Sequence, residues 1–119
     1  MFHLSMPVDR FADCLAFYEE VFEAEVVALS SKVANVFVFG AQITFHDQAH
    51  SPMTAAARQS MHFGAVVSPG EWTRLHQRIV GSGHSLLRCV EAREAPGGRA
   101  KLLIADPGGN LVEVNASAP

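Results

Sequence analysis

Three histidines lie in segments that alternate between apolar and polar residues, and a carboxylate lies in a fourth such segment. His3, His46 and His62 occupy FHLSMPV, QITFH and MHFGAVV, while Glu113 stands between two valines in LVEVN. Two imidazoles and one carboxylate on a common face form a ligand set for a borderline divalent metal, with positions left open for water and substrate. Such a metal acts as a Lewis acid on adjacent substrate oxygens, or binds dioxygen if it is iron.

These side chains can share a face only if their strands belong to one architecture, and the sequence predicts the same element order twice. Alternation indicates strands, and apolar residues at helical spacing indicate two amphipathic helices. In the first half we expect a strand at 2–8, a helix at about 10–23 with Asp9 as its N-cap, and strands at 25–30, 35–40 and 42–46. In the second half we expect a strand at 61–67, a helix begun by a capping box of Ser68 and Glu71 and ended by Gly81 and Gly83, and strands at 86–90, 101–105 and 111–115.

The two halves are therefore read as an internal repeat. His3 and His62 are repeat mates, and the segments GAQITFH and GNLVEVN pair Gly40 with Gly109. The predicted fold is α+β, with two βαβββ repeats forming a curved mixed eight-stranded sheet around a cleft and the helices on the outer face. We expect residues 1–119 to form a single domain, with repeat one at 1–46, a linker at 47–60 and repeat two at 61–119.

The strand alternation also assigns side chains to the two faces of the sheet. Apolar residues on one face would contact the helices, and the opposite face would be the polar wall of a cleft. The residues expected on the helix side are Phe2, Leu4, Ile43, Phe45, Phe63, Val67, Val112 and Val114. The residues expected to line the cleft are His3, Ser5, Gln42, Thr44, His46, His62, Glu113 and Asn115.

Composition excludes several classes of partner. The 119 residues are 49% hydrophobic and carry a net charge of −3, without a run of Lys and Arg, so no nucleic-acid partner is expected. No apolar stretch reaches the roughly 18 residues of a membrane span, and the N-terminus does not resemble a signal peptide. Two cysteines, Cys14 and Cys89, fit a reducing cytoplasmic location and are predicted to be small buried side chains.

Several segments together resemble the vicinal-oxygen-chelate superfamily, which includes glyoxalases, bleomycin-resistance proteins and extradiol dioxygenases. They are FHLSMPV, FADCLAFYEEVF, VFGAQITFH, MHFGAVVSPGEW and, most specifically, ADPGGNLVEV. The resemblance implies that His3, His62 and Glu113 bind a divalent metal ion, with Fe, Mn, Ni and Zn as candidates. It also implies a small-molecule substrate and a homodimer, often with a cleft shared between subunits.

The sequence departs from the family pattern at the fourth ligand position. Gly40 and Gly109 are 69 residues apart, and the same offset makes Thr44 the repeat mate of Glu113. Threonine is a poor metal ligand. Gln42 and His46 flank it on the same face, so we assign them catalytic or assisting roles near the metal. The departure argues against an ordinary glyoxalase I and leaves a three-ligand site, as in extradiol dioxygenases and fosfomycin-resistance thiol transferases.

Other interpretations remain open at this point. A strand histidine is more often packed and hydrogen-bonded than bound to a metal, and proteins of the bleomycin-resistance type bind a drug without a metal. A third possibility is a protein whose main role is assembly. Near the turn EAPGGR, Arg93, Arg99 and Lys101 could hold an anionic substrate group, or they could belong to a solvated hairpin.

Overall fold

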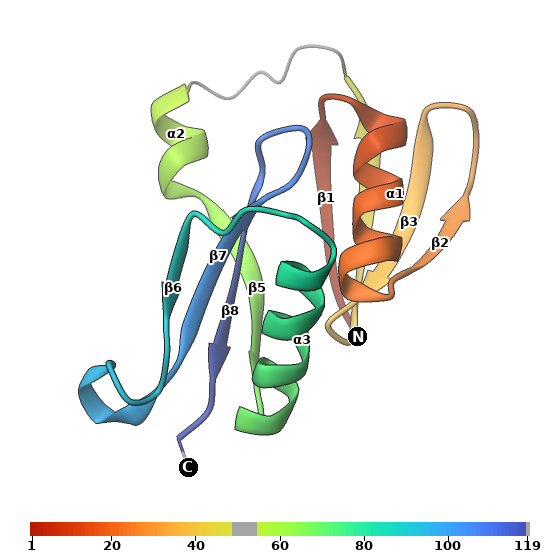
Figure 1. Cartoon of the computed structure of the whole chain (residues 1–119). Helices are drawn as coiled ribbons and strands as arrows, with labels where there is room; N and C mark the ends of the chain where they lie inside the picture. The colour runs from red at the N-terminus through yellow and green to blue at the C-terminus, as the bar shows by residue number, and fades with distance from the viewer. Residues whose placement is uncertain (49–54, 119) are drawn as a thin grey trace.

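Two units with the same order of elements follow one another along the chain (Figure 1). The computed structural model describes residues 1–48 and 55–118. The first unit consists of β1 (Phe2–Val8), α1 (Phe11–Phe22), β2 (Glu25–Ala28), β3 (Val33–Val38) and β4 (Ala41–Asp47). The second consists of β5 (His62–Val67), α3 (Pro69–Gly81), β6 (Arg88–Val90), η1 (Pro96–Gly98), β7 (Lys101–Ala105) and β8 (Leu111–Ala116).

The expected linker contains a short helix, as its alanine-rich sequence suggests. The helix α2 (Ala55–Ser60) directly precedes β5 and lies at the far end of the second unit in Figure 1. The residues 49–54 of the expected linker lie outside the described part of the chain.

Each unit forms its own four-stranded mixed sheet. The strand orders are β1-β4-β3-β2 and β5-β8-β7-β6, with the first and last strands of each unit paired in parallel. All eight predicted strands are present, but the two sheets are not hydrogen-bonded into one continuous sheet. The strands β1 and β5 are therefore both edge strands, each at one side of its own sheet.

The two helices begin in different ways. At α3 the Ser68 hydroxyl accepts a hydrogen bond from the Glu71 backbone N–H at 3.2 Å, as the capping box predicts. At α1 the prediction of Asp9 as N-cap is wrong. Arg10 takes that position in a left-handed conformation with φ of 55°, and its side chain makes no capping hydrogen bond.

The core lies between the helices and the inner faces of the sheets. α1 packs on β3 and β4, α3 packs on β8, and the two helices contact each other. The predicted face assignment holds for Ile43, Phe45, Val112 and Val114, which are all buried. Phe2 is the exception. It has the expected parity, but it is 68% exposed at the start of β1, so it is not a core residue.

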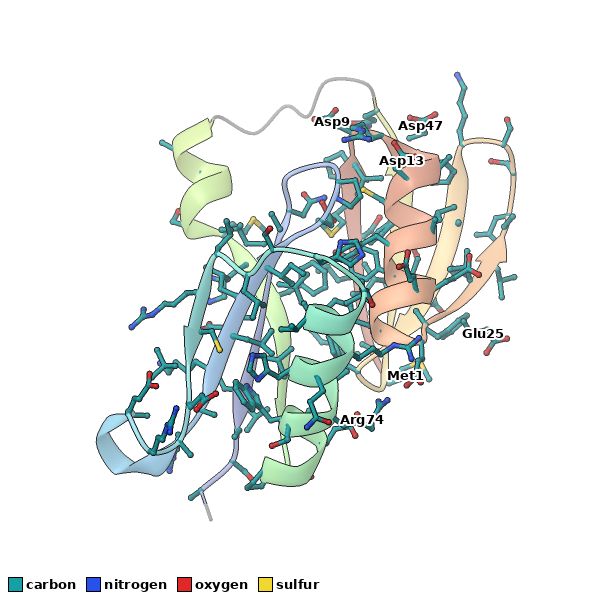
Figure 2. The ribbon with its side chains drawn as sticks, viewed as in Figure 1. Met1, Asp9, Asp13, Glu25, Asp47 and Arg74 are labelled. Atoms are coloured by element: carbon teal, nitrogen blue, oxygen red, sulfur yellow. The ribbon has the colours of Figure 1, made fainter. Side chains whose placement is uncertain are left out.

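Polar contacts also join the units. Arg74 of α3 forms an ion pair with Glu23, at the C-terminal end of α1, with an N–O distance of 2.9 Å. Figure 2 places Arg74 at the same end of the molecule as Met1 and Glu25, opposite to the end that carries Asp9 and its neighbours. Because these contacts connect α1 to α3, the helix layer is continuous although the sheets are separate.

The two cysteines have different environments. Cys14 is fully buried in α1, as predicted, but Cys89 is exposed on β6, so the prediction of two buried thiols is wrong for Cys89. The strand β6 has only three residues and lies at the edge of its sheet, where little covers it. Among the described helices, none is both long enough and apolar enough to span a membrane.

Candidate functional site

The second unit brings His62 and Glu113 into direct contact. His62 begins β5, Glu113 lies in the adjacent strand β8, and the His62 Nε2 atom is 2.9 Å from the Glu113 Oε2 atom. The side chains of His62 and Glu113 are 47% and 25% exposed, so the pair lies at an accessible surface. Both belong to the sheet face opposite α3, as the strand alternation predicts.

A backbone carbonyl fixes the orientation of the His62 ring. The Nδ1 atom lies 3.2 Å from the Ser60 carbonyl oxygen, which can only accept a hydrogen bond. Nδ1 is therefore placed to carry a proton. The Nε2 nitrogen and the carboxylate oxygen at 2.9 Å need a cation between them, either the proton of a hydrogen bond or a metal ion that binds both atoms.

His3 is held in the same way in the first unit. Its Nδ1 atom lies 3.2 Å from the Gln42 carbonyl oxygen on the paired strand β4. The Gln42 side-chain nitrogen lies 3.4 Å from the same Nδ1 atom, and an amide nitrogen can only donate a hydrogen bond. The carbonyl contact requires a proton on Nδ1, and the amide contact requires its absence, so both protonation states of Nδ1 have a partner in Gln42.

The predicted ligands His3, His62 and Glu113 do not gather into one cluster within a single chain. Within residues 1–48 and 55–118, no group of three or more His, Cys, Asp or Glu side chains is placed to hold a metal ion. The second sheet contributes the His62–Glu113 pair, and the first sheet contributes His3.

The two residues predicted to assist catalysis lie beside His3 on the first sheet. Gln42 is the register partner of His3, and the His46 Nε2 atom is 2.8 Å from the Ser5 hydroxyl oxygen. Ser5, His3 and His46 share the face opposite α1. This surface thus carries two imidazoles, a hydroxyl and a carboxamide.

The strand registers place Thr44 at the position equivalent to Glu113. Ser5 pairs with Thr44 in the first unit, and Gly64 pairs with Glu113 in the second, so both pairs follow the same repeat offsets. Thr44 is only 8% exposed, and its hydroxyl donates a hydrogen bond of 2.8 Å to Asn35 Oδ1 on β3. Its side chain is therefore used within the sheet.

Sequence analysis missed two parts of this arrangement. Ser5 was assigned to the cleft face but not recognised as the partner of His46, although its position two residues after His3 on the same face was a signal. The Ser60 carbonyl that orients His62 belongs to the backbone, so no residue type could have indicated it.

The comparisons with known proteins agree with this architecture. Residues 1–114 match the family model described as the Glyoxalase/Bleomycin resistance protein/Dioxygenase superfamily. Among solved structures, the fosfomycin resistance protein FosX from Listeria monocytogenes is similar, with a TM-score of 0.78 and 19% sequence identity over 99% of this chain and 93% of that chain. A second FosX structure, complexed with Mn(II) and sulfate, gives a TM-score of 0.73 and 20% identity over 99% and 90%. A lactoylglutathione lyase from Agrobacterium tumefaciens gives 0.72 and 20% over 98% and 92%.

Proposed function

Because the chain belongs to the Glyoxalase/Bleomycin resistance protein/Dioxygenase superfamily, we propose that it is a metal-dependent enzyme. Its substrate is a small molecule that binds the metal through two adjacent oxygens. The observation that carries the proposal is the His62–Glu113 pair, in which an imidazole nitrogen and a carboxylate oxygen meet at 2.9 Å on an accessible face. A manganese complex of the structurally similar FosX supports the proposal.

The donor set fits a divalent ion of iron, manganese, nickel or zinc. Imidazole nitrogens and a carboxylate suit each of these ions, and a backbone carbonyl orients each histidine ring. His62 and Glu113 would hold the ion from the second sheet, and His3 would supply the third ligand. When bound, the ion would polarise the substrate oxygens and stabilise negative charge that develops on them.

We propose that His3 comes from a second copy of the chain, in a homodimer. A single chain offers only two donors at one place among its described residues. His3 and His62 lie on edge strands, and each follows an exposed large apolar residue, Phe2 at 68% and Met61 at 52% exposure. Exposed apolar side chains of this size next to polar donors are typical of a surface that another subunit covers.

The remaining residues of the first sheet would orient groups and transfer protons. The carbonyl and side-chain amide of Gln42 hold the His3 ring. His46 is an imidazole whose Nε2 atom is hydrogen-bonded to Ser5, so it can exchange a proton with a substrate that lies on this face.

Metal content and affinity test the proposal. The purified chain is loaded with Mn²⁺, Fe²⁺, Ni²⁺ or Zn²⁺, and we expect close to one ion per chain for at least one metal. His3→Ala, His62→Ala and Glu113→Gln should each lose it, whereas His76→Ala, a histidine on α3, should keep it. Failure of the wild-type chain to bind any of the four ions would overturn the metalloenzyme proposal.

Mixing variants tests whether the site is shared between two chains. His3→Ala and His62→Ala each lack one ligand, so neither homodimer should bind metal. A heterodimer of the two contains one site with both histidines intact and one site with neither. Recovery of metal binding after co-refolding the two variants is therefore expected for a shared site, and no recovery would overturn the proposal that two chains share it.

The second candidate is a metal-free protein that binds a small molecule. Two observations favour it: no three metal-ligand side chains gather among the described residues, and Thr44 is engaged with Asn35 where a fourth ligand would be expected. If the chain binds none of the four metals, screening for drug-like ligands would test this alternative directly.

A further inference from the structure

We infer that the outer face of the second sheet contains an anion-binding site next to the His62–Glu113 pair, and that the substrate of the proposed enzyme is a small anion. The role of the bound anion as a substrate rests on the proposed function, whereas the anion-binding site itself does not. A cavity of about 490 Å³ lies on this face. Its lining contains three cationic side chains and a carboxamide, Arg88, Arg99, Lys101 and Asn115, which together are called the basic pocket.

The three cations of the basic pocket have no carboxylate partner in the described part of the chain. Four other arginines do: Arg10 pairs with Asp13, Arg74 and Arg78 both pair with Glu23, and Arg93 pairs with Glu91. Arg93 and Glu91 belong to the same hairpin as the basic pocket, yet that acidic side chain is turned to Arg93. Three unpaired like charges around one cavity repel each other, and an anion bound between them would remove that repulsion.

Register places the basic pocket beside the candidate metal ligands. On the outer face, one row across the sheet runs through Val90, Lys101, Asn115 and Val66. The adjacent row on the same face runs through Arg88, Leu103, Glu113 and Gly64. Neighbouring rows are two residues apart along a strand, or about 7 Å, so a molecule of a few bonds reaches from Lys101 to the Glu113 carboxylate.

A second cavity lies between the basic pocket and the candidate metal ligands. It has a volume of about 290 Å³, and its lining includes His62, Glu113, Val66 and Asn115. Val66 and Asn115 line both cavities, so the basic pocket is adjacent to the space over the His62–Glu113 pair. One ligand can therefore place its anionic end among the three cations and its other end at the candidate metal ligands.

Asn115 adds a requirement for the ligand. Its Oδ1 atom is buried and has no hydrogen-bond partner among the described residues. A buried acceptor without a donor costs free energy, so a ligand gains affinity if the Asn115 side chain rotates and its Oδ1 atom accepts a hydrogen bond from a ligand hydroxyl. The ligand class is therefore a small phosphate, phosphonate, sulfate or carboxylate with a hydroxyl group close to the anionic group.

Titration of the metal-free full-length chain with inorganic phosphate tests the site, with amide chemical shifts as the readout. We expect saturable shifts at Val66, Val90, Lys101 and Asn115. Arg99→Ala and Lys101→Ala should each weaken phosphate binding by about fivefold to tenfold, because each removes a charge-assisted hydrogen bond. The matched control is Arg93→Ala, which removes the same charge from the same hairpin and should leave the affinity unchanged.

Absence of saturable shifts at these residues, or equal weakening in the Arg93→Ala control, would overturn the inference. Lys101→Gln keeps the length of the side chain, and an unchanged spectrum elsewhere shows that a variant is folded. Metal binding is measured on the same samples. Phosphate binding without metal binding would support the anion site and overturn the metalloenzyme proposal. Metal binding without phosphate binding would overturn the anion site alone.

Two further probes separate the sources of the anion and test Asn115. Acetate is added as a competitor of phosphate at the same residues. If acetate binds at least as tightly as phosphate, the site is assigned to carboxylates. If acetate binds more weakly, the site is assigned to tetrahedral oxyanions. Glycolate adds one hydroxyl to acetate and should bind more tightly in the wild type but not in Asn115→Leu. Equal binding of glycolate and acetate in the wild type would overturn the role given to Asn115.

Discussion

At the scale of single residues, the orientation of the two repeat-mate histidines carries the functional argument. His3 and His62 each direct Nδ1 to a backbone carbonyl, from Gln42 and Ser60 respectively. A carbonyl cannot donate, so this contact turns Nε2 of each ring away from the carbonyl and, in His62, toward the Glu113 carboxylate. The spacing in the sequence was enough to identify the two histidines as mates, but the carbonyls that orient them depend on the folded backbone.

The two cysteines should differ in reactivity, because Cys14 is buried and Cys89 is exposed. Desolvation and the nearby Asp106 carboxylate raise the pKa of Cys14 to about 12. Partial burial, with Glu91 and Glu94 nearby, also raises the pKa of Cys89, but this thiol is exposed. We therefore expect one thiol per native chain to react with a disulfide reagent at about pH 8, more slowly than free cysteine.

Counting thiols with and without denaturant checks this expectation. Cys89→Ser should abolish the reaction of the native protein, and Cys14 should react only after unfolding. A native Cys89→Ser protein that still reacts at the rate of the wild type would contradict the burial of Cys14.

At the scale of elements, the close pairing of β5 and β8 positions the candidate ligands. Gly64 lies directly opposite Glu113, and a Cβ atom at this position would meet the Glu113 carbonyl oxygen at 1.7 Å. The backbone of β8 therefore occupies the place of a side chain at residue 64. This close approach holds the strand that carries Glu113 against the strand that carries His62.

Gly64→Ala should consequently push β5 away from β8. We expect a loss of about 1–3 kcal/mol in the free energy of unfolding, as for other overpacked sites, together with weaker metal binding by His62 and Glu113. Denaturant unfolding and metal titration measure the two effects.

The matched control for this prediction is Gly70→Ala, in the first turn of α3. A Cβ atom there has no neighbour within 4 Å, so this change should be neutral or slightly stabilising. An unchanged stability in Gly64→Ala would show that β8 shifts at no cost and would contradict the proposed role of the close pairing.

Elements and register within each unit were predictable from the sequence, because they depend on local patterns. The alternation in β4 and β8, anchored at two glycines, correctly aligned Thr44 with Glu113. Local patterns failed where a distant contact decides the outcome. Arg10 rather than Asp9 precedes α1, Cys89 is exposed on a short edge strand, and Arg88 was not recognised as part of the basic pocket.

The relation between the two units was the least predictable feature. Nothing in the alternation distinguishes one sheet of eight strands from two sheets of four, because both arrangements bury the same faces. Because the two sheets are separate, β1 and β5 are edge strands. The alternation therefore did not predict how His3 on β1 is placed relative to His62 and Glu113. The sequence thus identified the donors but not how one chain distributes them.

At the scale of the whole molecule, one buried carboxylate connects the two units. Asp106, in the turn between β7 and β8, accepts hydrogen bonds from the Gly108 and Asn110 backbone N–H groups and from the Asn110 side chain. It also accepts a bond of 2.9 Å from the Tyr18 hydroxyl of α1 in the other unit. The DPGGN turn thus also attaches the second unit to the first helix.

Because of this buried connection, the free energy of unfolding should decrease at alkaline pH. Burial and then the Asp106 carboxylate raise the pKa of Tyr18 well above its usual 10.0, and burial raises the pKa of Cys14 to about 12 from 9.0. Above these usual values the unfolded chain loses protons that the folded chain retains, so the free energy of unfolding falls as pH rises. The stabilisation is fully present below pH 9.0, declines first through Cys14, and declines more steeply above pH 10.0 through Tyr18.

Tyr18→Phe isolates the tyrosine contribution, because Tyr18 is the only tyrosine in the sequence. Near neutral pH the variant should lose about 1–3 kcal/mol, since the buried Asp106 Oδ2 atom loses the hydrogen bond from the Tyr18 hydroxyl and keeps the one from Asn110. The variant has no group at position 18 to ionise, so the difference from the wild type should narrow as pH rises above 10.0. Urea unfolding at a series of pH values measures this difference, and the ultraviolet absorbance of tyrosinate reports ionisation directly. A difference that stays constant across the alkaline range would mean that Tyr18 ionises as easily in the folded chain as in the unfolded one, which the buried bond to Asp106 does not allow.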